Sequence, residues 1–245
     1  MPNVLCVIPA RMGSTRLPGK PLELIAGIPL IVWVYRNAVA SGAFGEVCVA
    51  TDDERIAEVV AGEGGRAEMT SREHASGTDR VAEAASRFEC THIVNIQGDE
   101  PRIPHDLLRG FTAELVKLDD NSLLTIVSHA TIEEKSDPDT VKAVLGSDGQ
   151  ALYFSRAPIP YVRNEAADVC FKHCGIYGYT TASLHRFCGF EQKILEQVER
   201  LEQLRALEHG MKIRCMVHDF ESIGIDTPRD LERFRQWAAL NGYGC

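Results

Sequence analysis

Short apolar runs alternate with segments of helical periodicity in the first part of the chain. Residues 4–8, 46–51 and 92–97 are rich in Val and Ile and have the length of buried strands. Between them, apolar side chains recur at helical spacing over 22–41 and 79–88. Strands that alternate with helices are typical of a mostly parallel sheet with helices on both faces. We therefore expect the α/β class, with a Rossmann-like three-layer α/β/α arrangement.

The pattern changes after Leu123. It continues as short strand-like runs with turns between them, at 124–127, 141–145 and 151–155. We interpret 123–180 as a small antiparallel, β-rich excursion, which makes the central sheet mixed. The chain contains no internal repeat, low-complexity segment or obvious linker, so we expect a single domain over 1–245.

Two helices are expected towards the end of the chain. Residues 192–209 place apolar side chains on one face, which predicts a single amphipathic helix with Glu202 and Gln203 flanking its apolar stripe. A strand ending at Asp226 is followed by Thr227, Pro228 and Asp230, the pattern of a capped helix start. Because Thr227 already supplies the cap, Asp226 is a candidate metal ligand.

The composition is that of a water-soluble globular protein with an acidic surface. The chain has 245 residues, 44% hydrophobic and 25% charged, with a net charge of −9. This balance excludes a broad nucleic-acid surface, which needs a basic face. No apolar run approaches the roughly 20 residues that span a bilayer, and the chain starts without a signal-sequence pattern. We therefore expect a cytoplasmic protein without membrane insertion.

The eight cysteines are scattered, with no C-x-x-C pair. Several lie inside apolar runs, so they are interpreted as small buried side chains and not as a disulfide framework. Cys170, His173 and Cys174 lie close together in the sequence, but no second cluster completes four ligands. We do not expect a zinc site.

Positive charge gathers in the loop that follows the first strand, residues 10–21. This loop has two glycines, two hydroxyl side chains and three cations, and the first acidic residue of the chain is Glu23. Fixed cations and backbone N–H groups are typical of a phosphate site. The spacing is not that of a P-loop, since Pro18 stands where the second glycine is needed and Pro21 follows Lys20. The alternative is a solvated loop with ordinary surface cations.

Three loops follow predicted strands and are expected to meet at one edge of the sheet, where ligands bind in such folds. They are 11–20, 71–78 and 97–101. In the third, Asp99 lies beside Gly98, which permits close backbone approach, and we interpret it as a ligand of a divalent cation bound to phosphate. The alternative for Asp99 is a helix cap, the role that we assign to Glu100.

The candidate residues indicate one class of reaction. A cationic loop and two strand-end carboxylates, Asp99 and Asp226, without a nucleophile–base pair point to phosphoryl or nucleotidyl transfer. The signatures of serine hydrolases and of dinucleotide-binding dehydrogenases are absent from the sequence. Arg156, directly after an apolar run, is either a clamp for a substrate carboxylate or part of a surface ion pair.

Eight motifs, in this order, resemble the 3-deoxy-manno-octulosonate cytidylyltransferase (CMP-Kdo synthetase) family. They are 8–11 with 14–22, 50–52, 76–80, 94–101, 152–156, 175–177, 201–205 and 226–228. The resemblance implies the nucleotide-diphospho-sugar transferase type of fold. It also implies a reaction in which the anomeric 2-hydroxyl of 3-deoxy-D-manno-octulosonate (Kdo) attacks the α-phosphate of CTP. The products are CMP-Kdo, for lipopolysaccharide biosynthesis, and pyrophosphate.

The resemblance also implies roles for individual residues. Those implied for catalysis are Arg11, Lys20, Asp99 and Asp226, the two aspartates as ligands of Mg²⁺. Those implied for CTP are Ala10, Arg11, Ser14, Arg16, Lys20, Arg72, Ser76, Gly77 and Gln97. Those implied for the sugar are Gln97, Arg156, His173, Tyr177, Glu202 and Gln203, which replaces the surface interpretation of Glu202 and Gln203. Family members are commonly homodimers.

The sequence departs from the family at two places. The segment 161–172 is short, near where the distal end of the sugar is expected, and Asp79 stands where many members have Glu. The short segment leaves 8-amino-Kdo, and more remotely sialic acid, open as acceptors. A non-catalytic nucleotide-binding module is the alternative from another class.

Overall fold

The apolar run at the start of the chain forms strand β1 (Val4–Ala10), whose seven residues are all buried. It pairs in parallel with β4 (Glu46–Thr51) on one side and with β6 (His92–Ile96) on the other. β4 in turn pairs in parallel with β5 (Arg66–Met69). The sequence predicts β1, β4 and β6, and the parallel pairing puts the carboxyl ends of all four strands at the same edge of the sheet.

The computed structural model describes residues 3–13, 16–74, 76–164, 169–220 and 224–242. The chain divides into two units, one formed by 1–113 with 221–245 and the other by 114–220. Besides β1, β4, β5 and β6, the described part of the first unit contains η1 (Lys20–Leu22), β2 (Leu24–Ile25), β3 (Ile28–Pro29), α1 (Leu30–Ala40), α2 (Glu54–Gly62), α3 (Gly77–Ala85) and α9 (Pro228–Leu240). Helix α4 (His105–Leu115) runs from the first unit into the start of the second.

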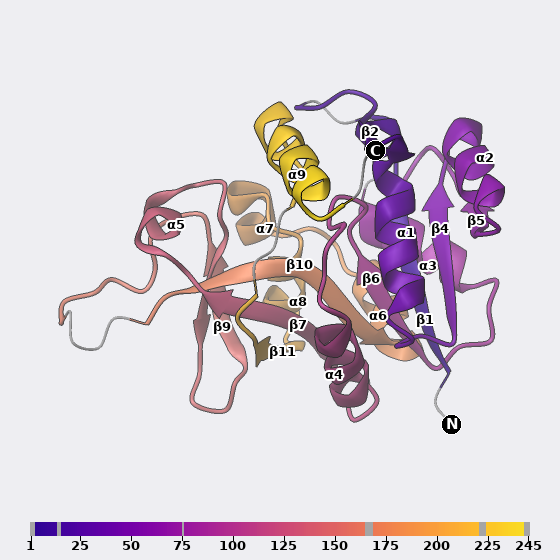
Figure 1. Ribbon diagram of the computed structural model, residues 1–245. Helices are drawn as coiled ribbons and strands as arrows, with labels where there is room; N and C mark the ends of the chain where they lie inside the picture. The colour runs from indigo at the N-terminus through magenta and orange to yellow at the C-terminus, as the bar shows by residue number, and fades with distance from the viewer. Residues whose placement is uncertain (1–2, 14–15, 75, 165–168, 221–223, 243–245) are drawn as a thin grey trace. The chain divides into compact units, whose positions relative to one another are not determined.

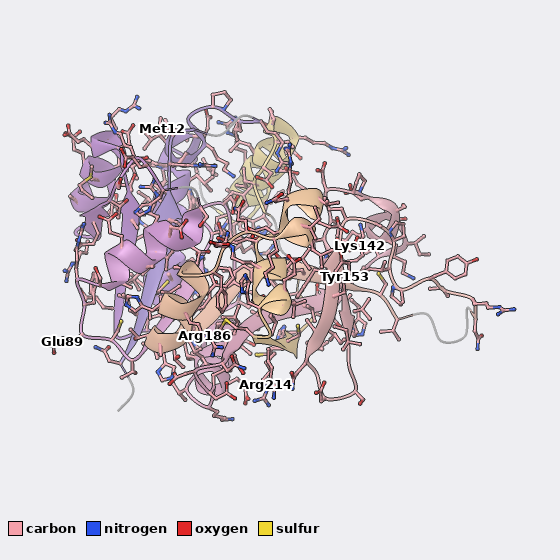
Figure 2. The ribbon with its side chains drawn as sticks, turned by 180° about the vertical axis from the view of Figure 1, so that it is seen from behind. Met12, Glu89, Lys142, Tyr153, Arg186 and Arg214 are labelled. Carbon is pink, nitrogen blue, oxygen red and sulfur yellow. The ribbon has the colours of Figure 1, made fainter. Side chains whose placement is uncertain are left out.

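Helices cover both faces of the β6-β1-β4-β5 sheet. Figure 1 shows α1 in front of these strands, with α2 beside it, and Figure 2, from behind, shows α3 on the opposite face. α9 packs on α1, where the ring of Phe234 lies 5.5 Å from that of Trp33 in an edge-on arrangement. This contact holds the start of α9, and with it Asp226, in the first unit.

One predicted helix starts too early. We expected a helix over 22–41, but α1 begins at Leu30 and is preceded by the two-stranded hairpin β2–β3. The turn of this hairpin, Ala26-Gly27, has positive φ at both residues (51° and 76°). Such a turn matches the twist of paired strands, so it closes a hairpin and not a helix.

The second unit holds the β-rich part of the chain. β10 (Phe171–Thr180) pairs antiparallel with β7 (Ser122–His129), and β11 (Lys212–Val217) pairs in parallel with β7. The other elements are α5 (Ile132–Ser136), β8 (Lys142–Leu145), β9 (Ala151–Ser155), α6 (Thr181–Cys188), α7 (Ile194–Glu199) and α8 (Gln203–Glu208). β8 and β9, which carry the labelled Lys142 and Tyr153 in Figure 2, form an antiparallel pair. The predicted excursion over 123–180 lies in this unit.

Two predictions near the carboxyl end are wrong. The single helix expected over 192–209 is two short helices, because Arg200 adopts a left-handed conformation (φ 53°) between α7 and α8. Ile194 and Val198, placed on its buried stripe by the sequence, are 66% and 72% exposed. The strand expected before Thr227 is absent from the described residues 224–226, whereas β11 was not predicted.

The predicted fold class is confirmed: a mostly parallel but mixed sheet arrangement with flanking helices and a small antiparallel part. The expectation of a single domain stays a prediction. Among the described residues, no helix combines the length and apolar character that crossing a membrane requires.

Candidate functional site

The loop after β1 directs Lys20 towards two carboxylates. Gly19 has a left-handed backbone (φ 75°) and starts the short helix η1 at Lys20, whose backbone N–H donates to the Leu17 carbonyl at 3.1 Å. A left-handed residue at this point suits glycine, which has no Cβ to clash. The turn places Lys20 in a fixed position with only 15% of its side chain exposed.

The Lys20 ammonium binds two aspartates that are far apart in the sequence. Its Nζ lies 2.6 Å from Asp99 Oδ2 and 3.1 Å from Asp226 Oδ1. Arg16 binds the other oxygen of Asp226, with its NH2 3.0 Å from Oδ2. The Ile225 N–H donates to the Asp99 carbonyl at 2.9 Å, which fixes the segment before α9 beside the end of β6. The predicted convergence of Lys20, Asp99 and Asp226 is therefore present.

These contacts determine the charge state of Lys20. Burial alone lowers the pKa of its ammonium, but the opposite charges of Asp99 and Asp226 outweigh burial and raise the pKa above its ordinary value. Lys20 is therefore a permanent cation at neutral pH.

A cavity of about 330 Å³ opens beside this cluster, at the carboxyl ends of β1 and β6. Seven of the residues expected to bind CTP line it: Ala10, Arg11, Arg16, Lys20, Ser76, Gly77 and Gln97. Asp99 and Asp226 line it as well. Arg72 is not among its lining residues; the side chain is exposed, with Nε 3.5 Å from the Asp52 carbonyl oxygen. Ser14 lies outside the described residues.

The Ser76 hydroxyl is already used in the structure. It accepts the Asp79 N–H at 3.1 Å and donates to Asp79 Oδ2 at 2.9 Å, which forms a capping box at the start of α3. Asp79 therefore does the work that Glu does in the usual capping box. The Ser76 hydroxyl is therefore already engaged at the start of α3.

Sequence reasoning missed two cavity-lining residues, Arg80 and His74. Arg80 is buried, with NH2 2.9 Å from Asp52 Oδ2 and NH1 2.5 Å from Thr70 Oγ1. His74 Nε2 lies 2.5 Å from Glu83 Oε2. The available signal for Arg80 was a cation on the apolar face of a predicted helix, since such a side chain needs a buried partner.

The two neighbouring aspartates at the end of β4 have different roles. Asp53 caps α2, accepting the Arg55 N–H at 3.0 Å. Asp52 instead forms the ion pair with Arg80, and this pair connects the end of β4 with α3 at the cavity wall.

Gly98 allows two strand ends to approach each other. A Cβ on this residue would lie 2.9 Å from the Pro9 carbonyl oxygen, a backbone atom that cannot turn away. Gly98 also lines the cavity and directly precedes Asp99. A residue with a side chain would push β1 and the 97–101 loop apart, so glycine is needed to bring Asp99 to Lys20.

The residues expected to bind the sugar, apart from Gln97, lie in the second unit. The rings of His173 and Tyr177 are 5.2 Å apart on the same side of β10. His173 Nε2 lies 2.8 Å from Thr125 Oγ1. Burial lowers the pKa of His173 to about 4 and raises that of Tyr177 well above its usual value, the latter with a contribution from the charge of Glu202. Both rings are therefore neutral at pH 7.

Arg156 and the 202–203 pair are held by their own neighbours in this unit. Arg156 donates from Nε to the Glu199 carbonyl at 3.2 Å and from NH1 to the Pro138 carbonyl at 3.0 Å. Gln203 is buried, and Glu202 lies 3.7 Å from Arg205 NH2. Because the helix breaks at Arg200, Glu202 and Gln203 do not lie on the surface of one continuous helix, as the periodicity predicted.

The Asp99–Asp226 pair has the donor chemistry that Mg²⁺ prefers. Within the described residues, no three His, Cys, Asp or Glu side chains are grouped to enclose a metal ion. Mg²⁺ is usually held by one or two carboxylates, with water and substrate phosphates completing its shell. Two carboxylates that already share one cation, Lys20, beside Arg11 and Arg16 for phosphate, fit this ion.

Comparison with known proteins identifies the family. The family model described as "Cytidylyltransferase" matches residues 5–213. A curated relative from Geobacter sulfurreducens, named 3-deoxy-manno-octulosonate cytidylyltransferase, is 45% identical over 94% of this chain and 97% of its own. One from Thermodesulfovibrio yellowstonii with the same name is 44% identical over 93% of this chain and 95% of its own. The chain belongs to the 3-deoxy-manno-octulosonate cytidylyltransferase family.

A solved member of this family has nearly the same structure. The CMP:2-keto-3-deoxy-manno-octonic acid synthetase complexed with CTP is 40% identical, with a TM-score of 0.93 over 98% of this chain and 99% of its own. A cytidylyltransferase from Leptospira borgpetersenii, 17% identical with a TM-score of 0.68, shares the fold alone. The resemblance of the motifs to the 3-deoxy-manno-octulosonate cytidylyltransferase family is therefore confirmed, and the chain is a nucleotidyltransferase.

The depressed pKa of His173 predicts a pH-dependent stability. Between pH 6.5 and about 4 the unfolded chain binds a proton that the folded chain does not, so stability falls as the pH falls through this range. From pH 7.5 to pH 4.5, the wild type should lose about 2 kcal/mol more unfolding free energy than His173→Gln. Urea denaturation at both pH values measures the difference. Equal losses in the two proteins would show that His173 titrates normally in the folded state.

Proposed function

We propose that this chain transfers CMP from CTP to the anomeric 2-hydroxyl of Kdo, giving CMP-Kdo and pyrophosphate for lipopolysaccharide biosynthesis. The observation that carries the proposal is the position of Lys20, between Asp99 and Asp226 at a cavity that Arg11 and Arg16 also line. Family membership supplies the substrates, CTP and Kdo, since the relatives carry that activity in their names.

In this proposal the cationic loop binds the triphosphate. Arg11, Arg16 and Lys20 neutralise phosphate oxygens, and the charge on the departing pyrophosphate is stabilised by side chains already in place. The hydroxyl oxygen of Kdo forms a bond to the α-phosphorus while the bond from that phosphorus to the pyrophosphate oxygen breaks. The hydroxyl proton passes to solvent.

The rest of the cavity positions the nucleoside. Ala10, Ser76, Gly77 and Gln97 line it. We assign the binding of cytosine to backbone groups of the first three, and contact with the ribose and the sugar to Gln97. Ser14 and Arg72 complete the CTP-binding set implied by the motifs. Arg80 and His74 form the wall behind this loop.

Asp99 and Asp226 would hold Mg²⁺. Bound there, the ion supplies charge neutralisation on the phosphates and lowers the pKa of the attacking hydroxyl. Within the part of the chain that the structure describes, no side chain stands out as a general base. We therefore assign metal binding to Asp99 and Asp226, and catalysis to these two residues together with Arg11 and Lys20.

The second unit would bind the sugar through Arg156, His173, Tyr177, Glu202 and Gln203. The neutral rings of His173 and Tyr177 can share hydrogen bonds with sugar hydroxyls, and Arg156 supplies the positive charge that a sugar carboxylate needs.

We also infer that the enzyme is a cytoplasmic homodimer, as the family resemblance implies. Sedimentation should then give twice the chain mass of 27.0 kDa, and a mass of one chain would refute the dimer.

Pyrophosphate release from CTP tests the function. With Kdo as acceptor and saturating Mg²⁺, the wild type should release pyrophosphate, and Asp99→Asn should lower kcat by about 100-fold or more, because a metal carboxylate is lost. Asp53→Asn is the matched control, since Asn also caps helices well and Asp53 lies outside the cavity. It should keep wild-type turnover.

The same assay separates the alternatives. A panel of Kdo, 8-amino-Kdo and sialic acid identifies the acceptor by its kcat/KM. CTP binding without pyrophosphate release for any acceptor would indicate the non-catalytic module instead. Wild-type turnover by Asp99→Asn would refute the metal assignment.

A further inference from the structure

Three carboxylate oxygens of the proposed metal pair are engaged by cations of the chain. Lys20 Nζ contacts Asp99 Oδ2 and Asp226 Oδ1, and Arg16 NH2 contacts Asp226 Oδ2. Lys20 is only 15% exposed and Asp99 only 26%, so water screens their contact weakly. These are charge-assisted hydrogen bonds of the stronger kind.

These contacts exclude a metal ion at the same three oxygens. At 2.6 Å from Asp99 Oδ2, the ammonium takes the position at which a divalent cation would bind that oxygen. Mg²⁺ and an ammonium also repel each other when they share two carboxylates. Lys20 must therefore leave before a metal can enter.

The charge of the cavity indicates what removes Lys20. The two carboxylates are balanced by Lys20 and Arg16, and Arg11 adds a positive charge to the same lining. Arg80 is balanced separately by Asp52. A cavity with a net positive charge attracts a polyanion and does not attract a free divalent cation.

We propose that Lys20 acts as an internal substitute for the metal: without nucleotide its ammonium holds the Asp99–Asp226 pair, and the pair binds a divalent cation only after the triphosphate draws Lys20 and Arg16 away. This inference rests on the proposed function. Its consequence is that metal and nucleotide bind cooperatively, because each favours the same rearrangement of one side chain.

Titration with Mn²⁺ in the absence of nucleotide tests the substitution directly. Free Mn²⁺ measured by electron paramagnetic resonance gives its affinity for the wild type, Lys20→Met and Lys20→Arg. Lys20→Met should bind Mn²⁺ at least about tenfold more tightly than the wild type, because the competing charged hydrogen bonds are gone. Lys20→Arg, which keeps the charge, should stay weak.

Two controls locate the effect. Lys172→Met removes a lysine of similar exposure (20%) from its contact with Glu134, and its Mn²⁺ affinity should equal that of the wild type. In Lys20→Met/Asp99→Asn the gain should disappear. Mn²⁺ should also raise the melting temperature of Lys20→Met but not that of the wild type. If Lys20→Met does not fold, Lys20→Gln takes its place in both measurements.

The outcomes are distinct from those of the activity assay. The inference is overturned if the wild type binds Mn²⁺ as tightly as folded Lys20→Met or Lys20→Gln, or if the gain persists after Asp99→Asn. In either case, pyrophosphate release by the wild type would leave the proposed function intact. A wild type without pyrophosphate release would refute the function, whatever the Mn²⁺ affinities are.

Discussion

The structure depends on one cation shared by two carboxylates that come from distant parts of the sequence. Lys20 contacts Asp99 after β6 and Asp226 before α9, and these three residues span most of the first unit. Carboxylates this close together repel each other unless a cation lies between them. The Lys20 ammonium therefore stabilises the arrangement. Under our proposal, one divalent ion would replace Lys20 and Arg16 together, which would keep the charge balance of the two carboxylates.

The fold serves this interaction by bringing three chain segments to one sheet edge. Parallel pairing of β1 with β6 puts the cationic loop beside the 97–101 loop, and Gly98 allows the close approach to Pro9. The packing of Phe234 on Trp33 then holds α9, so that Asp226 lies within reach. The turn after β1 positions Lys20, the pairing of β1 with β6 brings Asp99 beside it, and the packing of α9 positions Asp226.

The elements with strong local signals could be predicted from the sequence. The capping box of Thr227 and Asp230 fixes the start of α9, and the Val-rich run gives β4 with the observed bounds. The helix break at Arg200 could not be predicted, because a left-handed non-glycine residue has no sequence signature and is held by tertiary packing. The convergence of Lys20 and Asp99 was predicted because strand ends meet at one edge. Asp226 joins them from the segment before α9 and not from the strand end that the sequence predicted. The Asp52–Arg80 pair was not predicted, because an aspartate just before a helix start is equally well explained as a cap.

A crystal structure of the protein with CTP and Mn²⁺ tests the central claim most directly, since the anomalous signal of Mn²⁺ locates the ion without assumptions about the chain. The account predicts an Mn²⁺ peak bound by the carboxylates of Asp99 and Asp226, with the Lys20 ammonium moved onto a phosphate of the nucleotide. An Mn²⁺ peak away from both aspartates, with Lys20 still between them while CTP is bound, would contradict it.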